Sequence, residues 1–315
     1  MESHFRTESH AAYHNTLIDA KSRRKWLSSS MLCNILEGDR GDYHSPAKNF
    51  GHQFHTLVEA DLRRRPGLLL EAPLQQREAI DKFASRWEGK GRERLALLPP
   101  KATKWQREVA QAACEGRPVV ALPAGEHKKM RWMLTGMKSR LDDYRKKVPP
   151  NAAIEQSVYV SAFKRPKGLQ GWQQRIAEVW EALGMGVKAR ADYMHRVEGG
   201  WEWVDWKTTT LKSISSMRKE TYSRRYFIKA LFQSMAYTMA GRNVVKLRWV
   251  YVPKSSHKPL DIVIDLANPV VRAQVAADLE RMLPHKNHWA GYLVEYNSGT
   301  NAALNLYGDY APKET

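Results

Sequence analysis

Apolar residues recur at helical spacing through most of the first half of the chain. Between residues 50 and 62, Phe54, Leu57, Val58 and Leu62 fall on one face of a helix. A serine cap at residues 28–30 predicts a short helix over 31–36. Residues 1–26 are polar and lack periodicity, so they are expected to form a loosely ordered arm. Proline and glycine pairs separate three further predicted helices, over residues 74–87, 104–114 and 127–144.

Strand-like alternation replaces this periodicity after Pro149 and Pro150. Two alternating segments around Glu198-Gly199-Gly200 predict a hairpin. The predicted order is a strand over 154–163, a helix over 172–183, hairpin strands over 187–197 and 201–207, a helix over 225–239, strands over 244–253 and 260–264, and a helix over 269–283. This order predicts an α/β core behind a mainly helical N-terminal region. We expect one elaborated domain, with the helical region at 1–150, the core at 151–290 and a C-terminal tail at 291–315.

Composition indicates a class of partner rather than a fold. Lys and Arg total 51 against 33 Asp and Glu, giving a net charge of +18, and eleven Trp are interspersed with the basic clusters. Such an excess favours a polyanionic partner, and no strongly apolar helical face accompanies it to indicate a membrane surface. With no run of about 18 apolar residues and no secretory leader, the protein is expected to be cytoplasmic. Cys33 and Cys114 are too few for a disulfide framework or a four-cysteine metal site.

The candidate chemistry lies on the hairpin. Alternation places Asp205 and Lys207 on one face of their strand and Trp206 on the other, with Asp192 on the preceding strand. Two carboxylates ~4 Å apart repel by roughly 4 kcal/mol at an effective dielectric near 20, and a bound divalent cation relieves this repulsion. Oxygen ligands suit Mg²⁺ or Mn²⁺, so phosphodiester hydrolysis is the natural chemistry. The alternative for Asp205 and Lys207 is a cross-strand salt bridge. The Asp-x-Lys triplet alone is weak evidence, since Asp19-Ala20-Lys21 repeats it outside such a context.

A longer series of motifs resembles a known family. In chain order the series is Gly51-His52-Gln53-Phe54-His55, Glu155, Asp192, Asp205-Trp206-Lys207 and Gln233-Ser234-Met235-Ala236-Tyr237. It resembles the PD-(D/E)XK nuclease superfamily, specifically the branch with RecB-type nucleases and the phage exonucleases of the exonuclease VIII (RecE) type. Ala191 stands where that family typically has a proline before the aspartate, and the helix-like segment 169–183 is a longer connection than in many relatives.

The resemblance implies a restriction-endonuclease-like core, in which a mixed central sheet is flanked by helices, and it implies a set of roles. Asp192, Asp205 and the backbone carbonyl of Trp206 would hold Mg²⁺, for which Mn²⁺ can substitute, with Glu155 and His55 completing the site. Lys207 would orient the attacking water or stabilise the charge on the phosphorane, and both roles stay open. Gln233 and Tyr237 would support the active site and the DNA end. Basic residues after the hairpin are candidate phosphate contacts or a solvated face: Arg218, Lys219, Arg224 and Arg225.

The resemblance also implies an activity. We expect digestion of linear double-stranded DNA from its ends, 5′ to 3′, which leaves a 3′ single strand for a RecT-like annealing protein. A ring-shaped homo-oligomer of three or four subunits is expected, in the bacterial host cytoplasm for a phage-encoded protein. The alternatives are a RecB-like endonuclease, whose common four-cysteine iron–sulfur site two cysteines cannot build, and an inactive DNA-binding protein on the same fold. A basic structural protein with a fortuitous Asp-x-Lys would leave the ordered series unexplained.

Overall fold

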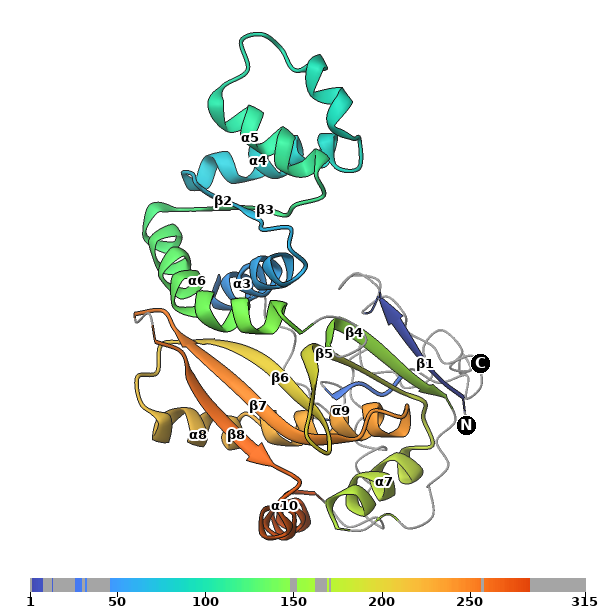
Figure 1. The fold of residues 1–315 in the computed structure, drawn as a ribbon. Coiled ribbons are helices and arrows are strands. Elements are labelled where there is room, and N and C mark those ends of the chain that lie inside the picture. Colours follow the sequence, from blue (N-terminus) through green and yellow to red (C-terminus); the bar gives the residue numbers. More distant parts are fainter. Residues whose placement is uncertain are drawn as a thin grey trace, which may run out of the picture.

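A six-stranded mixed sheet forms the centre of the molecule in a computed structural model that describes residues 2–7, 13, 26–29, 32, 46–147, 152–161, 169, 171–255 and 258–283 (Figure 1). The strand order is β1-β4-β5-β6-β7-β8. Only β6 and β7 are parallel, and every other neighbouring pair in this described sheet is antiparallel. The strands are β1 (Glu2–Thr7), β4 (Ala152–Ser161), β5 (Val187–Val197), β6 (Gly200–Thr209), β7 (Val244–Pro253) and β8 (Leu260–Asp265).

Helices cover both faces of this sheet (Figure 1). One face carries α3 (Pro46–Leu62) and α6 (Ala124–Arg145), and the other carries α7 (Trp172–Leu183), α8 (Ile214–Ser223), α9 (Tyr226–Met239) and α10 (Pro269–Met282). The buried side chains accordingly form two main clusters, one on each side of the sheet. The expected α/β core with a mixed sheet flanked by helices is therefore confirmed.

The apolar spacing of the helices explains how they pack. Met130, Met133 and Met137 recur every three or four residues along α6, and all three are fully buried against the sheet beside Trp206. On the other face, α9 buries nine of its residues because it lies between the sheet and neighbouring helices. A helix that is apolar on most sides is typical of such an enclosed position.

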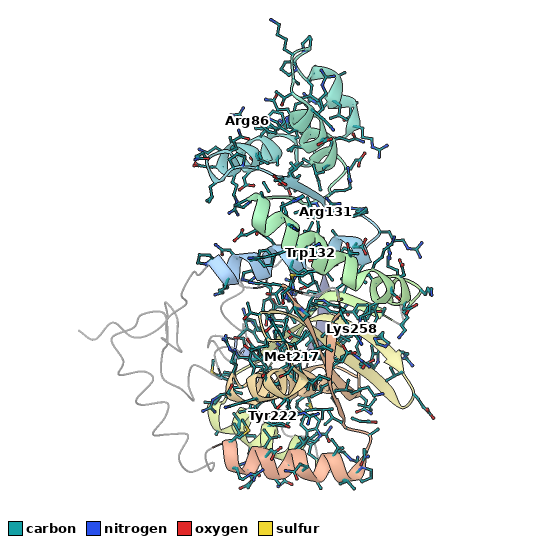
Figure 2. All side chains as sticks on the ribbon, turned by 90° about the vertical axis from the view of Figure 1, so that its left-hand side faces the viewer. Arg86, Arg131, Trp132, Met217, Tyr222 and Lys258 are labelled. Atoms are coloured by element: carbon teal, nitrogen blue, oxygen red, sulfur yellow. The ribbon has the colours of Figure 1, made fainter. Side chains whose placement is uncertain are left out.

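A small lobe stands apart from the sheet, between α3 and α6 in the chain. It consists of β2 (Leu68–Glu71), α4 (Leu74–Trp87), the 3₁₀ helix η1 (Arg92–Leu97), α5 (Lys104–Cys114) and β3 (Val119–Leu122). β2 and β3 pair in parallel, and the lobe has its own small core. Figure 2 shows Arg86 of α4 in this lobe, at the far end of the molecule from Met217 and Tyr222 of α8, with Arg131 and Trp132 of α6 between.

Most predicted elements are confirmed, and the differences lie where the hydrophobic signal is weakest. The helices at 74–87, 104–114 and 172–183 and the strands at 187–197 and 244–253 have the predicted bounds. The hydrophobic pattern does not predict the four-residue strands β2 and β3 or the helix α8. The helix expected over 31–36 and the tail at 291–315 lie largely or wholly outside the described residues. No helix in the described part of the chain has the length and apolar character needed to cross a bilayer.

The expectation of a loose arm over residues 1–26 is wrong for its first residues. Residues 2–7 form β1, which pairs antiparallel with β4 at the sheet edge. The sequence of β1 shows no apolar alternation: it is Glu-Ser-His-Phe-Arg-Thr. An edge strand can nevertheless form, since backbone hydrogen bonds hold it with few buried side chains. Phe5 stacks on Tyr237 of α9, so the chain start reaches the sheet beside the candidate site.

Gly200 begins β6, and we expect its replacement by alanine to destabilise the protein. A Cβ at this position would overlap the Asn243 carbonyl oxygen, which accepts a hydrogen bond from the Trp201 N–H at the start of the β6–β7 pair. Overpacking of this kind costs about 1–3 kcal/mol in the free energy of unfolding. Gly125→Ala in α6 is the control, because nothing lies within 4 Å of its Cβ and alanine favours a helix. Denaturant unfolding that gave equal stability changes for the two variants would contradict this account.

Candidate active site

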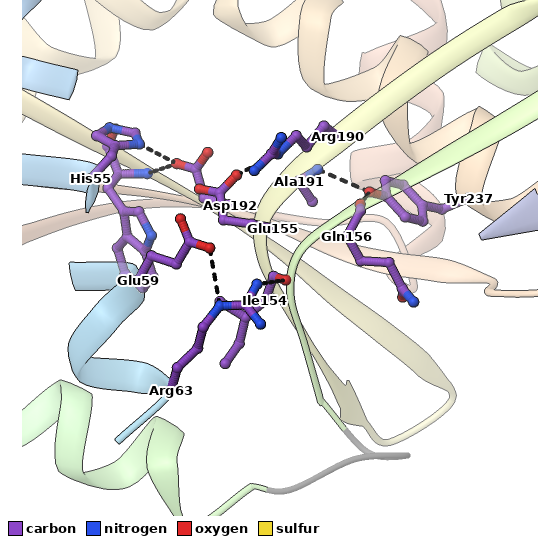
Figure 3. Close-up of polar contacts among 11 residues, drawn as sticks. His55, Glu59, Arg63, Ile154, Glu155, Gln156, Arg190, Ala191, Asp192 and Tyr237 are labelled. Atoms are coloured by element: carbon purple, nitrogen blue, oxygen red, sulfur yellow. Dashed lines mark hydrogen bonds and ion pairs between the residues drawn. The ribbon is translucent and has the colours of Figure 1, made fainter. Parts of the chain in front are cut away.

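Three potential metal ligands from different elements converge near the middle of strands β4 and β5. His55 lies on α3, Glu155 on β4 and Asp192 on β5, and one ligand atom from each lies within 4.8 Å of the other two (Figure 3). Two carboxylates and an imidazole at this spacing fit the donor chemistry of a divalent cation. The His55 side chain is 27% exposed and that of Asp192 16%, so the group opens to solvent.

His55 connects Asp192 to the backbone of β6. Its Nδ1 lies 3.3 Å from Asp192 Oδ2, and its Nε2 donates to the Trp206 carbonyl oxygen at 2.8 Å. The Trp206 N–H donates in turn to Asp192 Oδ2 at 2.9 Å. Burial lowers the pKa of His55, but Asp192 outweighs it and raises this pKa to about 9. The doubly protonated imidazolium therefore bridges a carboxylate and a carbonyl that both attract a cation.

Glu155 occupies a strained position opposite Asp192. Its φ is 47°, and it sits between Ile154, paired with Tyr193, and Gln156, paired with Ala191. Positive φ is uncommon for a residue with a side chain and costs of order 1–3 kcal/mol. Arg190 Nε lies 2.6 Å from Glu155 Oε2 and offsets part of its charge.

The two opposed carboxylates have pKa values shifted in opposite directions. Burial, followed by the charge of Asp192, raises the pKa of Glu155 to about 8, against the opposing effect of Arg190. Burial also raises the pKa of Asp192, but the charge and hydrogen bond of His55 outweigh it and hold this pKa below its usual value. At neutral pH Asp192 is thus the ionised member of the pair, and Glu155 retains its proton unless further positive charge arrives.

Asp205 and Lys207 form the second part of the cluster, on β6. Lys207 Nζ lies 2.6 Å from Asp205 Oδ2 and 4.7 Å from the centre of the Tyr226 ring on α9. Burial lowers the pKa of Lys207, but Asp205 and its other neighbours raise it above the ordinary value, so Lys207 is an ammonium at neutral pH. Burial raises the pKa of Asp205, partly offset by Lys207. Trp206 points to the opposite face and packs in the core, as alternation predicts.

The Tyr237 hydroxyl bonds to both β4 and β5 next to the site. The Ala191 N–H donates to the Tyr237 hydroxyl at 2.9 Å, and this hydroxyl donates to the Gln156 carbonyl oxygen (Figure 3). The tyrosine thus stands between two backbone groups of the paired residues Gln156 and Ala191. It therefore links β4 and β5 through its hydroxyl, immediately beside the position where Glu155 and Asp192 face each other.

The structure places the remaining predicted residues on α8, on α9 and at the turn between them. The Gln233 amide binds Trp203 Nε1 and Ser29 Oγ, so its observed contacts are with the core and the N-terminal segment. Four basic residues follow β6: Arg218 and Lys219 are exposed on α8, Arg224 pairs with Glu220, and Arg225 precedes α9 at a φ of 54°.

The sequence motifs do not predict two residues that contact the cluster, Arg190 and Tyr226. Arg190 is two residues before Asp192 on the same strand, so alternation could have placed it on the same face. Tyr226 is brought to Lys207 by the packing of α9 against the sheet, and no local pattern marks it.

Comparisons with known proteins identify the family of this chain. A family model described as the PD-(D/E)XK nuclease superfamily matches residues 24–295. No curated protein matches the chain. Among solved structures, one described as "Crystal structure of SSO0001" is 12% identical, with 77% of this chain and 89% of that chain covered and a TM-score of 0.23. A likeness at that TM-score supports no structural argument.

Removal of the Tyr237 hydroxyl is expected to destabilise the protein. Tyr237→Phe keeps the ring but leaves the Ala191 N–H and the Gln156 carbonyl without this partner, and each unsatisfied buried polar group costs about 1–3 kcal/mol. Tyr222→Phe on α8 is the matched control, since its ring is partly exposed and packs against Phe227 in a tilted arrangement. Chemical denaturation should give a lower midpoint for Tyr237→Phe only. Equal midpoints for the two variants would mean that the two hydrogen bonds of the Tyr237 hydroxyl do not stabilise the protein.

Proposed function

We propose, because this chain belongs to the PD-(D/E)XK nuclease superfamily, that it is a divalent-metal-dependent exodeoxyribonuclease acting on linear double-stranded DNA. The observation that carries the proposal is the convergence of His55, Glu155 and Asp192 beside the ammonium group of Lys207. Packing alone does not explain why these carboxylates and this lysine lie together, because each ionisable group is costly to bury.

The ion we propose is Mg²⁺, with Mn²⁺ as a substitute, because carboxylate and carbonyl oxygens suit both ions. Asp192 and Glu155 would hold it, and His55 would join them after its imidazolium loses a proton, because only the neutral imidazole has a lone pair for a metal. Asp205 and the Trp206 carbonyl oxygen are the further ligands that the motif resemblance implies. A bound ion of this kind polarises a phosphate and lowers the pKa of a coordinated water. Its positive charge would also counter the burial and the nearby Asp192 charge that together raise the pKa of Glu155.

Lys207 is best suited to stabilise negative charge. Its raised pKa keeps the ammonium protonated at neutral pH, so it donates hydrogen bonds rather than removing a proton from water. Asp205 and the face of Tyr226 hold this ammonium from two sides. A fixed donor aimed at developing charge stabilises a transition state more than a mobile one, because it needs no reorganisation. Between the two roles left open by the sequence, we therefore favour stabilisation of the phosphorane.

The finer features of the activity follow from the family branch that the motifs resemble. We propose 5′ to 3′ digestion from DNA ends, a ring-shaped trimer or tetramer, and a RecT-like annealing protein as the consumer of the 3′ strand. The net charge of +18 supports a polyanionic substrate. A cytoplasmic location would bring the enzyme together with this substrate.

Replacement of Lys207 is expected to abolish most of the activity. In Mg²⁺, Lys207→Ala should lower the rate of digestion of a linear duplex about 10²- to 10³-fold, the loss typical for one donor to developing negative charge. Lys246→Ala, on the neighbouring strand β7, removes the same charge and should keep the wild-type rate. Wild type without divalent metal should be inactive. Equal rates for Lys207→Ala and wild type would refute the proposed role.

The shape of the substrate separates exonuclease from endonuclease. An end-dependent enzyme should degrade linear duplex and leave covalently closed circles of the same sequence intact. Release of label from 5′-labelled and 3′-labelled ends should show the 5′ label first. Cleavage of circles at the rate of linear DNA would instead identify a RecB-like endonuclease, and binding without hydrolysis in either metal would identify an inactive DNA-binding protein.

A further inference from the structure

The first half of α6 combines a run of cations with an exposed tryptophan. Between Glu126 and Asp142, this helix contains five lysine or arginine residues and no acidic residue. Trp132 lies among them and is 37% exposed, whereas every other tryptophan in the described part of the chain is buried or partly buried. An exposed indole alone is ordinary on a protein surface, so its charged surroundings decide what it indicates.

Lys128 and Trp132 are one helical turn apart on the outer face of α6. Lys128 Nζ lies 4.9 Å from the centre of the Trp132 ring. Both residues are exposed, whereas Met130 and Met133 are fully buried on the opposite face, so the indole does not serve the core. A flat aromatic ring beside an ammonium group offers both features that nucleic-acid strands recognise, a stacking face and a positive charge.

Two further lysines extend this surface toward β7. The strand ends beside α6 (Figure 1), and Lys254 follows its last residue. The pKa of Lys254 is lowered, first by burial and then by the charge of Lys129, while Glu126 acts in the opposite direction. The two ammonium groups are therefore close enough to repel each other, and neither pairs with a carboxylate within the described ranges. An anion between them would relieve this repulsion.

Lys254 connects this surface to the candidate active site. Its N–H donates to the Thr209 carbonyl oxygen at 2.8 Å, two residues after Lys207, and its Nζ lies 4.6 Å from the centre of the Phe50 ring. Phe50 precedes His55 by five residues, which is about 7.5 Å along α3 at 1.5 Å per residue. The α6 surface, as we name it, consists of Lys254, Lys129, Lys128 and Trp132.

We propose that the α6 surface binds single-stranded DNA, with an unpaired base stacked on Trp132 and neighbouring phosphates held by the lysines. Aromatic side chains bind bases of any sequence by stacking, and the cations beside them follow the backbone. Stacking on an indole requires a base whose own face is free, and in a duplex only the terminal bases have one. The proposal deepens the proposed function and rests on it, since an exonuclease that digests one strand of a duplex leaves the other strand unpaired.

Binding of three oligonucleotides to wild type and to variants of Trp132 tests the stacking. Fluorescence anisotropy in EDTA gives the affinity for a single strand, for a strand of the same length in which abasic sites replace the bases, and for a blunt duplex. Trp132→Leu removes the aromatic face and keeps an apolar side chain, whereas Trp132→Phe keeps an aromatic ring. Neither variant changes the net charge.

Trp132→Leu should bind the single strand about 5- to 150-fold more weakly than wild type, the loss that corresponds to one base–aromatic stack. Trp132→Phe should recover most of this affinity. Both variants should bind the abasic strand as wild type does, because that strand has no base to stack. An equal loss on the abasic strand, a loss confined to the duplex, or unchanged single-strand affinity in Trp132→Leu overturns the proposal.

The salt dependence of binding tests the lysines. Lys128→Gln with Lys129→Gln should reduce the slope of log affinity against log salt for the single strand by roughly 1.4, about 0.7 for each cation that contacts a phosphate. Arg86→Gln with Lys90→Gln removes the same charge from exposed positions in the distant lobe and should keep the wild-type slope (Figure 2). Equal slopes for these two double variants would contradict phosphate binding at the α6 surface.

Binding in EDTA separates this inference from the proposed activity. Failure of wild type to hydrolyse any duplex in Mg²⁺ or Mn²⁺, together with weaker single-strand binding by Trp132→Leu, would refute the exonuclease and retain the α6 surface. Normal digestion by wild type, together with equal single-strand affinities for wild type and Trp132→Leu, would do the reverse. Equal thermal midpoints for wild type and all variants confirm that the proteins are folded.

Discussion

The architecture of the site depends on the repulsion among carboxylates that the sheet brings together. Glu155 and Asp192 face each other across β4 and β5, and Asp205 adds a third carboxyl group from β6. Buried like charges of this kind are stable only beside fixed positive charges. The structure provides one for each carboxylate: Arg190 for Glu155, His55 for Asp192 and Lys207 for Asp205. Each cation arrives from a position that the fold fixes, so the placement of α3 against the sheet is part of the electrostatics.

Much of the fold is predictable from hydrophobic period alone. The core strands and the amphipathic helices carry strong periodicity, and several of them have the predicted bounds. The segments that escape prediction are short or polar: β1 at an edge, the four-residue strands β2 and β3, and α8. Their stability comes from contacts with segments far away in sequence, for which a local pattern has no signal.

The candidate site is only partly predictable, because some of its contacts also join segments that are far apart in the sequence. Alternation is sufficient to place Asp205 and Lys207 on one face, because both lie on one regular strand. It cannot show that the Tyr237 hydroxyl stands between the backbones of two strands, or that Tyr226 reaches Lys207. These contacts depend on how deeply α9 packs against the sheet, and only the three-dimensional structure shows that depth. The family model supports the nuclease superfamily, whereas the exonuclease branch rests on the motifs alone.

The parallel pairing of β2 with β3 constrains how the lobe can vary. Two parallel strands cannot be joined by a tight turn, because the chain must return to the starting end before it can form the second strand. The helices α4 and α5 supply that return path, so the excursion between Glu71 and Val119 has a minimum length. Insertions are best accommodated in the stretch between α4 and α5, where the chain is exposed, whereas deletion of either helix would unpair the strands. The lobe can therefore grow in evolution more easily than it can shrink.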